Sequence, residues 1–150
     1  MSPKNRLIIL PMIKNDDLIK DMSNYDLGLA LEPNSPPNKN LTISNKLFHY
    51  MAGGLPVIAS YTAGHAEIGL QNQDIIFLYE QNNIAKLTGL LNDLANKITD
   101  GSFRLNNTVL KTYQTNYSWD IEEKKLVALI SDSFIHDDPQ EIKASPIYEP

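Results

Sequence analysis

Three polar residues, Ser44, Asn45 and Lys46, stand together directly before a run of residues with helical spacing. Serine is a preferred N-cap residue, and the first backbone N–H groups of a helix have no partners within that helix. These N–H groups carry the positive end of the helix dipole. The start of this helix is therefore predicted to bind an anion such as a phosphate.

Lys46 supports this prediction through its position in the first turn. A cation there lies at the positive end of the dipole and costs about 0.3 to 1 kcal/mol, and a bound phosphate would reverse that penalty. The alternative is a lysine whose long side chain bends into water. His49 follows one turn later on the same general side, where it either contacts a ligand or is a packed or solvated histidine.

Three further residues, Glu32, His65 and Glu67, have the chemistry of a general acid or base. The sequence shows no pairing between them, so each can also be an ordinary loop residue. The glycine patterns of dinucleotide-binding and P-loop proteins are missing, as is the H-E-x-x-H pattern of zinc proteases. Residues 53–54 are a glycine pair that a helix stop explains. No pattern calls for a metal or a cofactor.

The composition indicates one ordinary globular domain. The chain has 150 residues, of which 42% are hydrophobic and 21% charged, enough to bury a core. Its formal net charge of -5 does not favour a nucleic-acid partner. The absence of cysteine excludes thiolate chemistry and cysteine-ligated metals. The apolar run 7–13 is broken by Pro11 and is shorter than the roughly 20 residues that span a bilayer, so we expect no membrane span.

Short apolar runs alternate with helical patterns along the chain. We expect strands at 7–10, 26–31, 56–59 and 75–78, and helices starting at the caps Asn15, Ser44 and Ser118 and at Ile84. The helix from Ile84 repeats Leu87, Leu91, Leu94 and Ile98 as a core stripe, and the last helix is expected to bury Leu126, Leu129, Ile130 and Phe134. This order predicts an α/β fold: a partial Rossmann-like parallel sheet flanked by helices, with a C-terminal helix.

Two loops are expected to bring the candidate site residues together. Residues 32–41 contain three prolines and are expected to form a surface loop without a helix. Residues 60–67 form the second loop, and in a parallel sheet both loops lie at the carboxyl edge, with the helix at Ser44 pointing between them. We expect a domain at 1–135 and a mobile tail at 136–150.

The stretch 44–60, SNKLFHYMAGGLPVIAS, resembles the donor-binding half of GT-B glycosyltransferases of the GT4-like, group 1 kind. These enzymes commonly show sNKlfeYmaaGlPVias at this place. The segment YDLGL at 25–29 is similar to their yDiGl, and YSW at 117–119 is similar to their late ysW. The resemblance covers residues 6–135.

The resemblance implies that a sugar is transferred from a nucleotide-diphosphate sugar to a glycan or lipid-linked acceptor. By similarity, Thr42, Ser44, Asn45 and Lys46 would hold the diphosphate and sugar, with Lys46 near the phosphates. The family's E-x7-E pattern falls on Leu41 and His49, so neither of its carboxylates is present. Contact between His49 and the nucleoside ribose is a hypothesis based on its ring nitrogens.

The chain departs from complete enzymes of this family in its length. Compared with that family, we expect the given sequence to be without the N-terminal acceptor domain and without the first strand–helix units, which carry an arginine and a lysine that clamp the diphosphate. We therefore expect an inactive isolated chain, an uncovered sheet edge, and either self-association or a partner chain. The resemblance implies a cytoplasmic protein, which would be peripheral at the inner membrane face if the parent enzyme builds an envelope polysaccharide. The rival interpretations are a truncated nucleotide-sugar-binding or partner-docking module and a fragment of a GT-B sugar-nucleotide epimerase.

Overall fold

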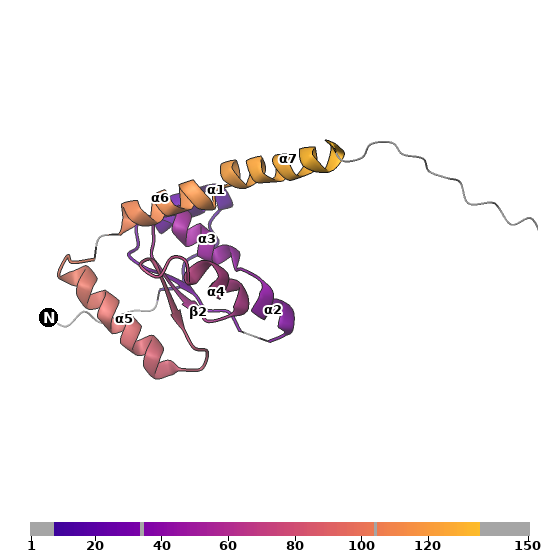
Figure 1. Cartoon of the computed structure of the whole chain (residues 1–150). Helices are drawn as coiled ribbons and strands as arrows, with labels where there is room; N and C mark the ends of the chain where they lie inside the picture. Colours follow the sequence, from indigo (N-terminus) through magenta and orange to yellow (C-terminus); the bar gives the residue numbers. More distant parts are fainter. Residues whose placement is uncertain (1–7, 34, 104, 136–150) are drawn as a thin grey trace, which may run out of the picture.

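A three-stranded parallel sheet forms the centre of the computed structural model, which describes residues 8–33, 35–103 and 105–135 (Figure 1). Its strands are β1 (Gly28–Ala30), β2 (Val57–Ser60) and β3 (Ile76–Tyr79), paired in that order. In the register, Ile58 lies between Leu29 and Phe77. The α/β class with a parallel sheet is confirmed.

Seven helices are found in the described residues: α1 (Asn15–Met22), α2 (Pro37–Leu41), α3 (Asn45–Ala52), α4 (Ala63–Gly69), α5 (Ile84–Thr99), α6 (Asn106–Asn116) and α7 (Trp119–Ile135). Helix α3 packs against β1, β2 and α6, while α4 and α5 both contact β3. Figure 1 shows α3 and α5 on opposite sides of the sheet. The sheet is therefore flanked by helices, as predicted.

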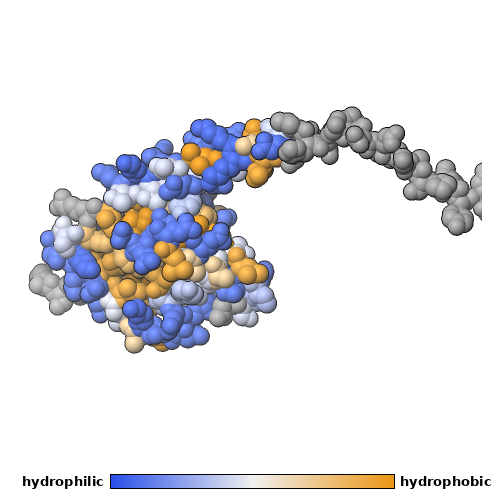
Figure 2. Space-filling model, viewed as in Figure 1, coloured by the Kyte–Doolittle hydropathy of each residue, from blue (hydrophilic) through white to orange (hydrophobic). Residues whose placement is uncertain are grey.

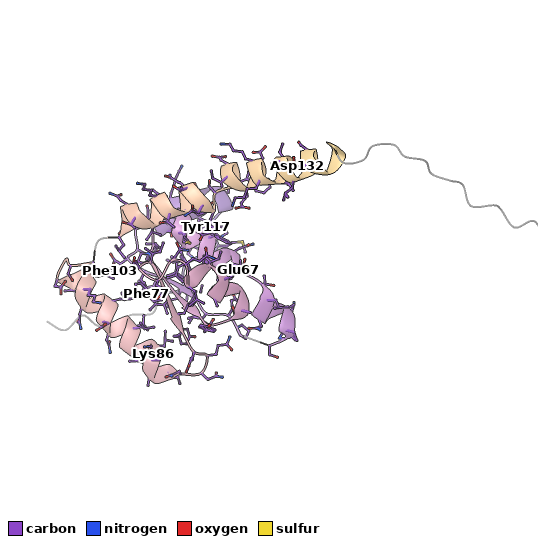
Figure 3. The ribbon with its side chains drawn as sticks, in the orientation of Figure 1. Glu67, Phe77, Lys86, Phe103, Tyr117 and Asp132 are labelled. Atoms are coloured by element: carbon purple, nitrogen blue, oxygen red, sulfur yellow. The ribbon has the colours of Figure 1, made fainter. Side chains whose placement is uncertain are left out.

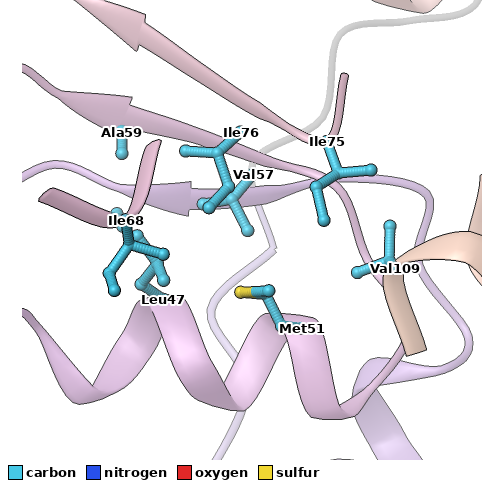
Figure 4. Close-up of a cluster of buried hydrophobic side chains, with 9 residues drawn as sticks. Leu47, Met51, Val57, Ala59, Ile68, Ile75, Ile76 and Val109 are labelled. Carbon is cyan, nitrogen blue, oxygen red and sulfur yellow. The ribbon is translucent and has the colours of Figure 1, made fainter. Parts of the chain in front are cut away.

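The core lies between α3 and the sheet (Figure 4). Leu47 and Met51 point from α3 toward Val57 and Ile76, and Val109 of α6 closes one end. All four residues of β2 are buried, as expected for a strand covered on both faces. At the end of α3 the chain turns through Gly54, whose φ of 76° favours glycine, so the predicted helix stop is confirmed.

The strand expected at 7–10 is a wrong prediction for residues 8–10, while Leu7 lies outside the described residues. Residues 8–10 belong to no strand, and Ile9 is 87% exposed. An apolar segment becomes a strand only when a neighbouring strand takes its backbone hydrogen bonds, and these residues have none. Residues 8–10 therefore add no strand to the three-stranded sheet.

Both expected loops contain a helix. In the first, Pro37 is the first residue of α2, a position where proline's missing N–H costs nothing. The three prolines therefore did not exclude a helix. In the second, the Thr62 hydroxyl accepts a hydrogen bond from the His65 N–H and caps α4. Each helix shortens the flexible part of its loop.

The amphipathic helices are less buried than their patterns predict. In α5 only Leu94 is fully buried, and Ile84 is 76% exposed. Helix α7 extends away from the rest of the molecule, so the expected burial of Leu126, Leu129 and Ile130 is wrong (Figures 1 and 2). The side chain of Phe134 and the tail at 136–150 lie outside the described residues. Helix α6 was not predicted.

Two expected caps also differ from the structure. Helix α1 begins at Asn15 itself, with Lys14 at the cap position and no side-chain cap. Ser118 does precede α7, but its hydroxyl donates to the Gln114 carbonyl of the preceding helix at 3.0 Å. Both elements exist where the sequence placed them, and only their terminal hydrogen bonds were misassigned.

Candidate functional site

The start of α3 is built as the sequence predicted. The Ser44 hydroxyl caps the helix by accepting a hydrogen bond from the Lys46 N–H at 3.3 Å. The apolar side of the helix, Leu47 and Met51, is buried against the sheet and fixes its direction. The first turn of α3 therefore stays at the surface, with Lys46 on it.

Lys46 is not the unpaired cation that the sequence suggested. Its Nζ lies 2.5 Å from Oε1 of Glu32, and the Ser44 hydroxyl donates to the same oxygen at 3.1 Å. A second lysine, Lys39 of α2, places its Nζ 3.9 Å from Oε2 of Glu32. One carboxylate thus lies between two ammonium groups at the positive end of α3.

The charge of Glu32 is stabilised by this arrangement. The hydrogen bond from Lys46 does most to hold the pKa of the Glu32 carboxyl below its ordinary value. The Ser44 hydroxyl and the charges of Lys46 and Lys39 act in the same direction, while burial opposes them. The Glu32 side chain is 12% exposed, whereas that of Lys46 is 56% exposed. Glu32 is therefore a carboxylate at neutral pH, and the lysines remain reachable from solvent.

A cavity of about 290 Å³ lies beside this ion cluster. It is lined by Glu32, Lys39, Thr42, Ile43, Ser44, Asn45 and Lys46. Four of the five predicted site residues are thus brought together, namely Thr42, Ser44, Asn45 and Lys46. The sequence singled out Glu32 only as a general acid or base candidate and missed Lys39, which lies in the segment expected to be a plain loop.

His49, the fifth predicted site residue, does not line this cavity. It is half-buried on the second turn of α3. Its backbone carbonyl accepts the N–H of Gly53 and helps to end the helix. Contact between its ring and a ribose stays a prediction.

The main chain of Glu32 joins the carboxyl ends of all three strands. Its N–H donates to the Ser60 hydroxyl at 2.6 Å, and its carbonyl accepts from that hydroxyl at 2.7 Å. Gln81, two residues after β3, donates its Nε2 to the same carbonyl at 2.8 Å. The site therefore lies at the sheet edge where ligands bind in open parallel folds.

The other two acid–base candidates lie elsewhere. His65 is completely buried in α4, and its Nδ1 is 3.0 Å from the Ser60 carbonyl. A carbonyl only accepts, so Nδ1 carries the proton and His65 fastens α4 to the end of β2. Glu67 is exposed on α4 (Figure 3). Neither residue lines the cavity beside α3.

A larger cavity of about 570 Å³ lies along β3 between the end of α4 and the start of α5. It is lined mainly by apolar side chains, including Leu70, Leu78 and Leu90. Phe77 of β3 contacts Phe103 on the same side of the molecule as α5 (Figure 3). This cavity has one cation, Lys86, in its lining. The smaller cavity has two lysines in its lining, so it is the better candidate for binding an anion.

No group of three histidine, aspartate or glutamate side chains is placed to hold a metal ion in the part of the chain that the structure describes. None of the helices within the described ranges has the length and apolar character needed to cross a bilayer.

Comparisons with protein-family models, with curated proteins and with solved structures find no match for this sequence.

Proposed function

We propose that this chain is the donor-binding portion of a glycosyltransferase, which holds a nucleotide-diphosphate sugar at the start of α3. The observation that carries the proposal is the convergence of two lysines, Lys39 and Lys46, on one cavity at the carboxyl edge of a parallel sheet. Three of the residues that line this cavity, Ser44, Asn45 and Lys46, open the segment 44–60 that resembles the donor-binding half of GT-B enzymes.

The cavity supplies the electrostatics that such a transfer needs. When a sugar leaves its nucleotide, negative charge grows on the diphosphate, and preorganised donors near that charge lower the barrier. Here the Lys46 ammonium and the positive end of the α3 dipole supply this stabilisation, with Lys39 beside the other carboxylate oxygen of Glu32. Thr42 and Asn45 line the same cavity and offer hydrogen bonds to sugar hydroxyls.

The proposal includes a partner for the acceptor side. An acceptor-binding domain, from another part of a longer protein or from a second chain, would face the cavity and present the glycan or lipid-linked acceptor. Sugar transfer at the inner membrane face would then require that partner and a lipid-linked acceptor. The isolated chain is expected to bind nucleotides without measurable sugar transfer.

Calorimetric titration of the chain with UDP, GDP and UDP-sugars tests this function. We expect saturable binding that weakens by about 1 to 3 kcal/mol in Lys46→Ala, the usual cost of a lost charged hydrogen bond. Lys125→Ala is the matched control, because Lys125 forms a similar exposed pair with Glu122 at 2.6 Å on α7. Failure of the folded wild-type chain to bind any of these nucleotides would contradict the proposal.

A partner-docking module is the second candidate, and the exposure of α7 favours it. Leu126, Val127 and Ile130 are each about half exposed on a helix that extends from the molecule. Strand β1 also lies at one edge of the sheet. Sedimentation of the full chain across a range of concentrations tests self-association, which the double variant Leu126→Glu/Ile130→Glu should reduce.

A further inference from the structure

We propose that the Glu32 carboxylate occupies the position of a ligand phosphate group, and that a phosphate-bearing ligand displaces it from Lys46, Lys39 and Ser44. This inference rests on the proposed function, since it describes how the same cavity would accept its ligand. It makes Glu32 a residue that sets the affinity and selectivity of the site.

The contacts of Glu32 are those that a phosphate would take. Its Oε1 accepts from the Lys46 ammonium at 2.5 Å and from the Ser44 hydroxyl at 3.1 Å, and its Oε2 faces Lys39 at 3.9 Å. A phosphate group is likewise an anion with several acceptor oxygens, and ammonium groups and helix starts bind it. The two anions cannot share these partners, because like charges at contact distance repel.

The carboxylate can move without disturbing the fold. The backbone of Glu32 is fixed by Ser60 and Gln81, and these hydrogen bonds use only its main-chain N–H and carbonyl. Rotation of the side chain therefore leaves the three strand ends joined. The cavity beside it has about 290 Å³, which gives a phosphate group room to enter.

Displacing the Glu32 carboxylate costs free energy, which weakens ligand binding. This cost also makes the site selective for the charge of the ligand. A singly charged ligand gains little by replacing one carboxylate with another anion of equal charge. A diphosphate brings more negative charge to the two lysines than Glu32 does, so it is favoured over a monoanion. The Glu32 carboxylate also compensates part of the positive charge of Lys39 and Lys46 when no ligand is bound.

Calorimetry with pyrophosphate and UDP on Glu32→Gln tests the inference. Glutamine keeps the shape of the side chain and removes its charge, so binding of both probes should tighten about tenfold, with a smaller gain at high salt. Glu122→Gln is the matched control, because it removes the carboxylate of a similarly short lysine pair, at 2.6 Å, on α7. Equal or weaker binding by folded Glu32→Gln would overturn the inference while leaving the proposed function standing if the wild type binds.

A second measurement on the wild-type chain covers the case in which Glu32→Gln does not fold. With glutamate labelled at its carboxyl carbon, NMR should show the pKa of Glu32 rising when pyrophosphate saturates the site, because the carboxylate leaves Lys46. An unchanged or lower pKa at saturation would overturn the inference. If the folded wild-type chain binds none of pyrophosphate, UDP and GDP, the proposed function fails and this inference fails with it.

Discussion

The Glu32 carboxylate makes the ion pairs found at the start of α3. Its carboxylate compensates the ammonium groups of Lys39 and Lys46 and the positive end of α3 at once. Lys46 is mostly exposed, so solvent screens this pair and its contribution to stability is modest. The contribution depends on pH, because only the ionised carboxyl makes these contacts.

The sign of that pH dependence follows from the lowered pKa of Glu32. A carboxyl whose pKa is lower in the folded state stabilises the fold above its unfolded pKa and loses this stabilisation as the pH falls through the folded pKa. We therefore expect Glu32→Gln to be less stable than the wild type at pH 7, with the difference shrinking as the pH falls below about 4.5. Urea unfolding at several pH values measures it. A difference that does not change with pH would contradict this prediction.

Only part of the site is predictable from single residues. The capped helix start at Ser44 and the position of Lys46 follow from local preferences, and both are found. The pairing of Lys46 with Glu32 does not, because the two residues are 14 positions apart and meet only through the path of the chain between them. The dipole penalty that argued for a bound phosphate is thus partly relieved inside the protein.

At the scale of elements, the site depends on how closely α4 approaches the segment before α3. Gly64 of α4 has no room for a side chain, since an added Cβ would lie 2.6 Å from the backbone carbon and oxygen of Thr42. Thr42 lines the candidate cavity. The packing of one helix against the chain therefore sets the position of a site residue.

We expect Gly64→Ala to destabilise the chain by about 1 to 3 kcal/mol, because backbone must shift to admit the methyl group. Gly89→Ala is the matched control, since Gly89 is also helical but has no atom within 4 Å of an added Cβ. That control should stabilise α5 by about 0.5 to 1 kcal/mol through helix propensity. Denaturant unfolding of the two variants measures both values. Equal effects at the two glycines would show that the close approach to Thr42 is unimportant.

Elements were predicted well where local chemistry decides them and poorly where the rest of the molecule does. Strand β2 has a continuous apolar run, and helix α3 has a cap and a stop of its own. Both elements are confirmed. Segment 8–10 is as apolar as a strand but has no neighbouring strand. Helix α6 has a weak apolar pattern, and it is fixed by packing Val109 against the core.

At the scale of the whole molecule, apolar side chains divide into two populations. One is buried around α3 and the sheet, where Leu47 is fully enclosed. The other is exposed, with its largest groups on α7 and in residues 8–12, and Figure 2 shows apolar side chains on the projecting helix. A chain with this division should draw nearly all of its stability from the first population.

The same substitution placed in each population tests this division. Leu47→Ala should cost about 2 to 5 kcal/mol, since it leaves a cavity between α3 and the sheet. Leu126→Ala removes the same atoms from a side chain that is 49% exposed, and it should change the unfolding free energy by no more than about 0.5 kcal/mol. Urea unfolding of dilute protein, where association is weakest, measures both. A loss above about 1 kcal/mol in Leu126→Ala would mean that α7 packs against the folded molecule or a second copy in solution. Repeating the measurement at higher protein concentration separates these two cases, because only packing against a second copy makes the loss depend on concentration.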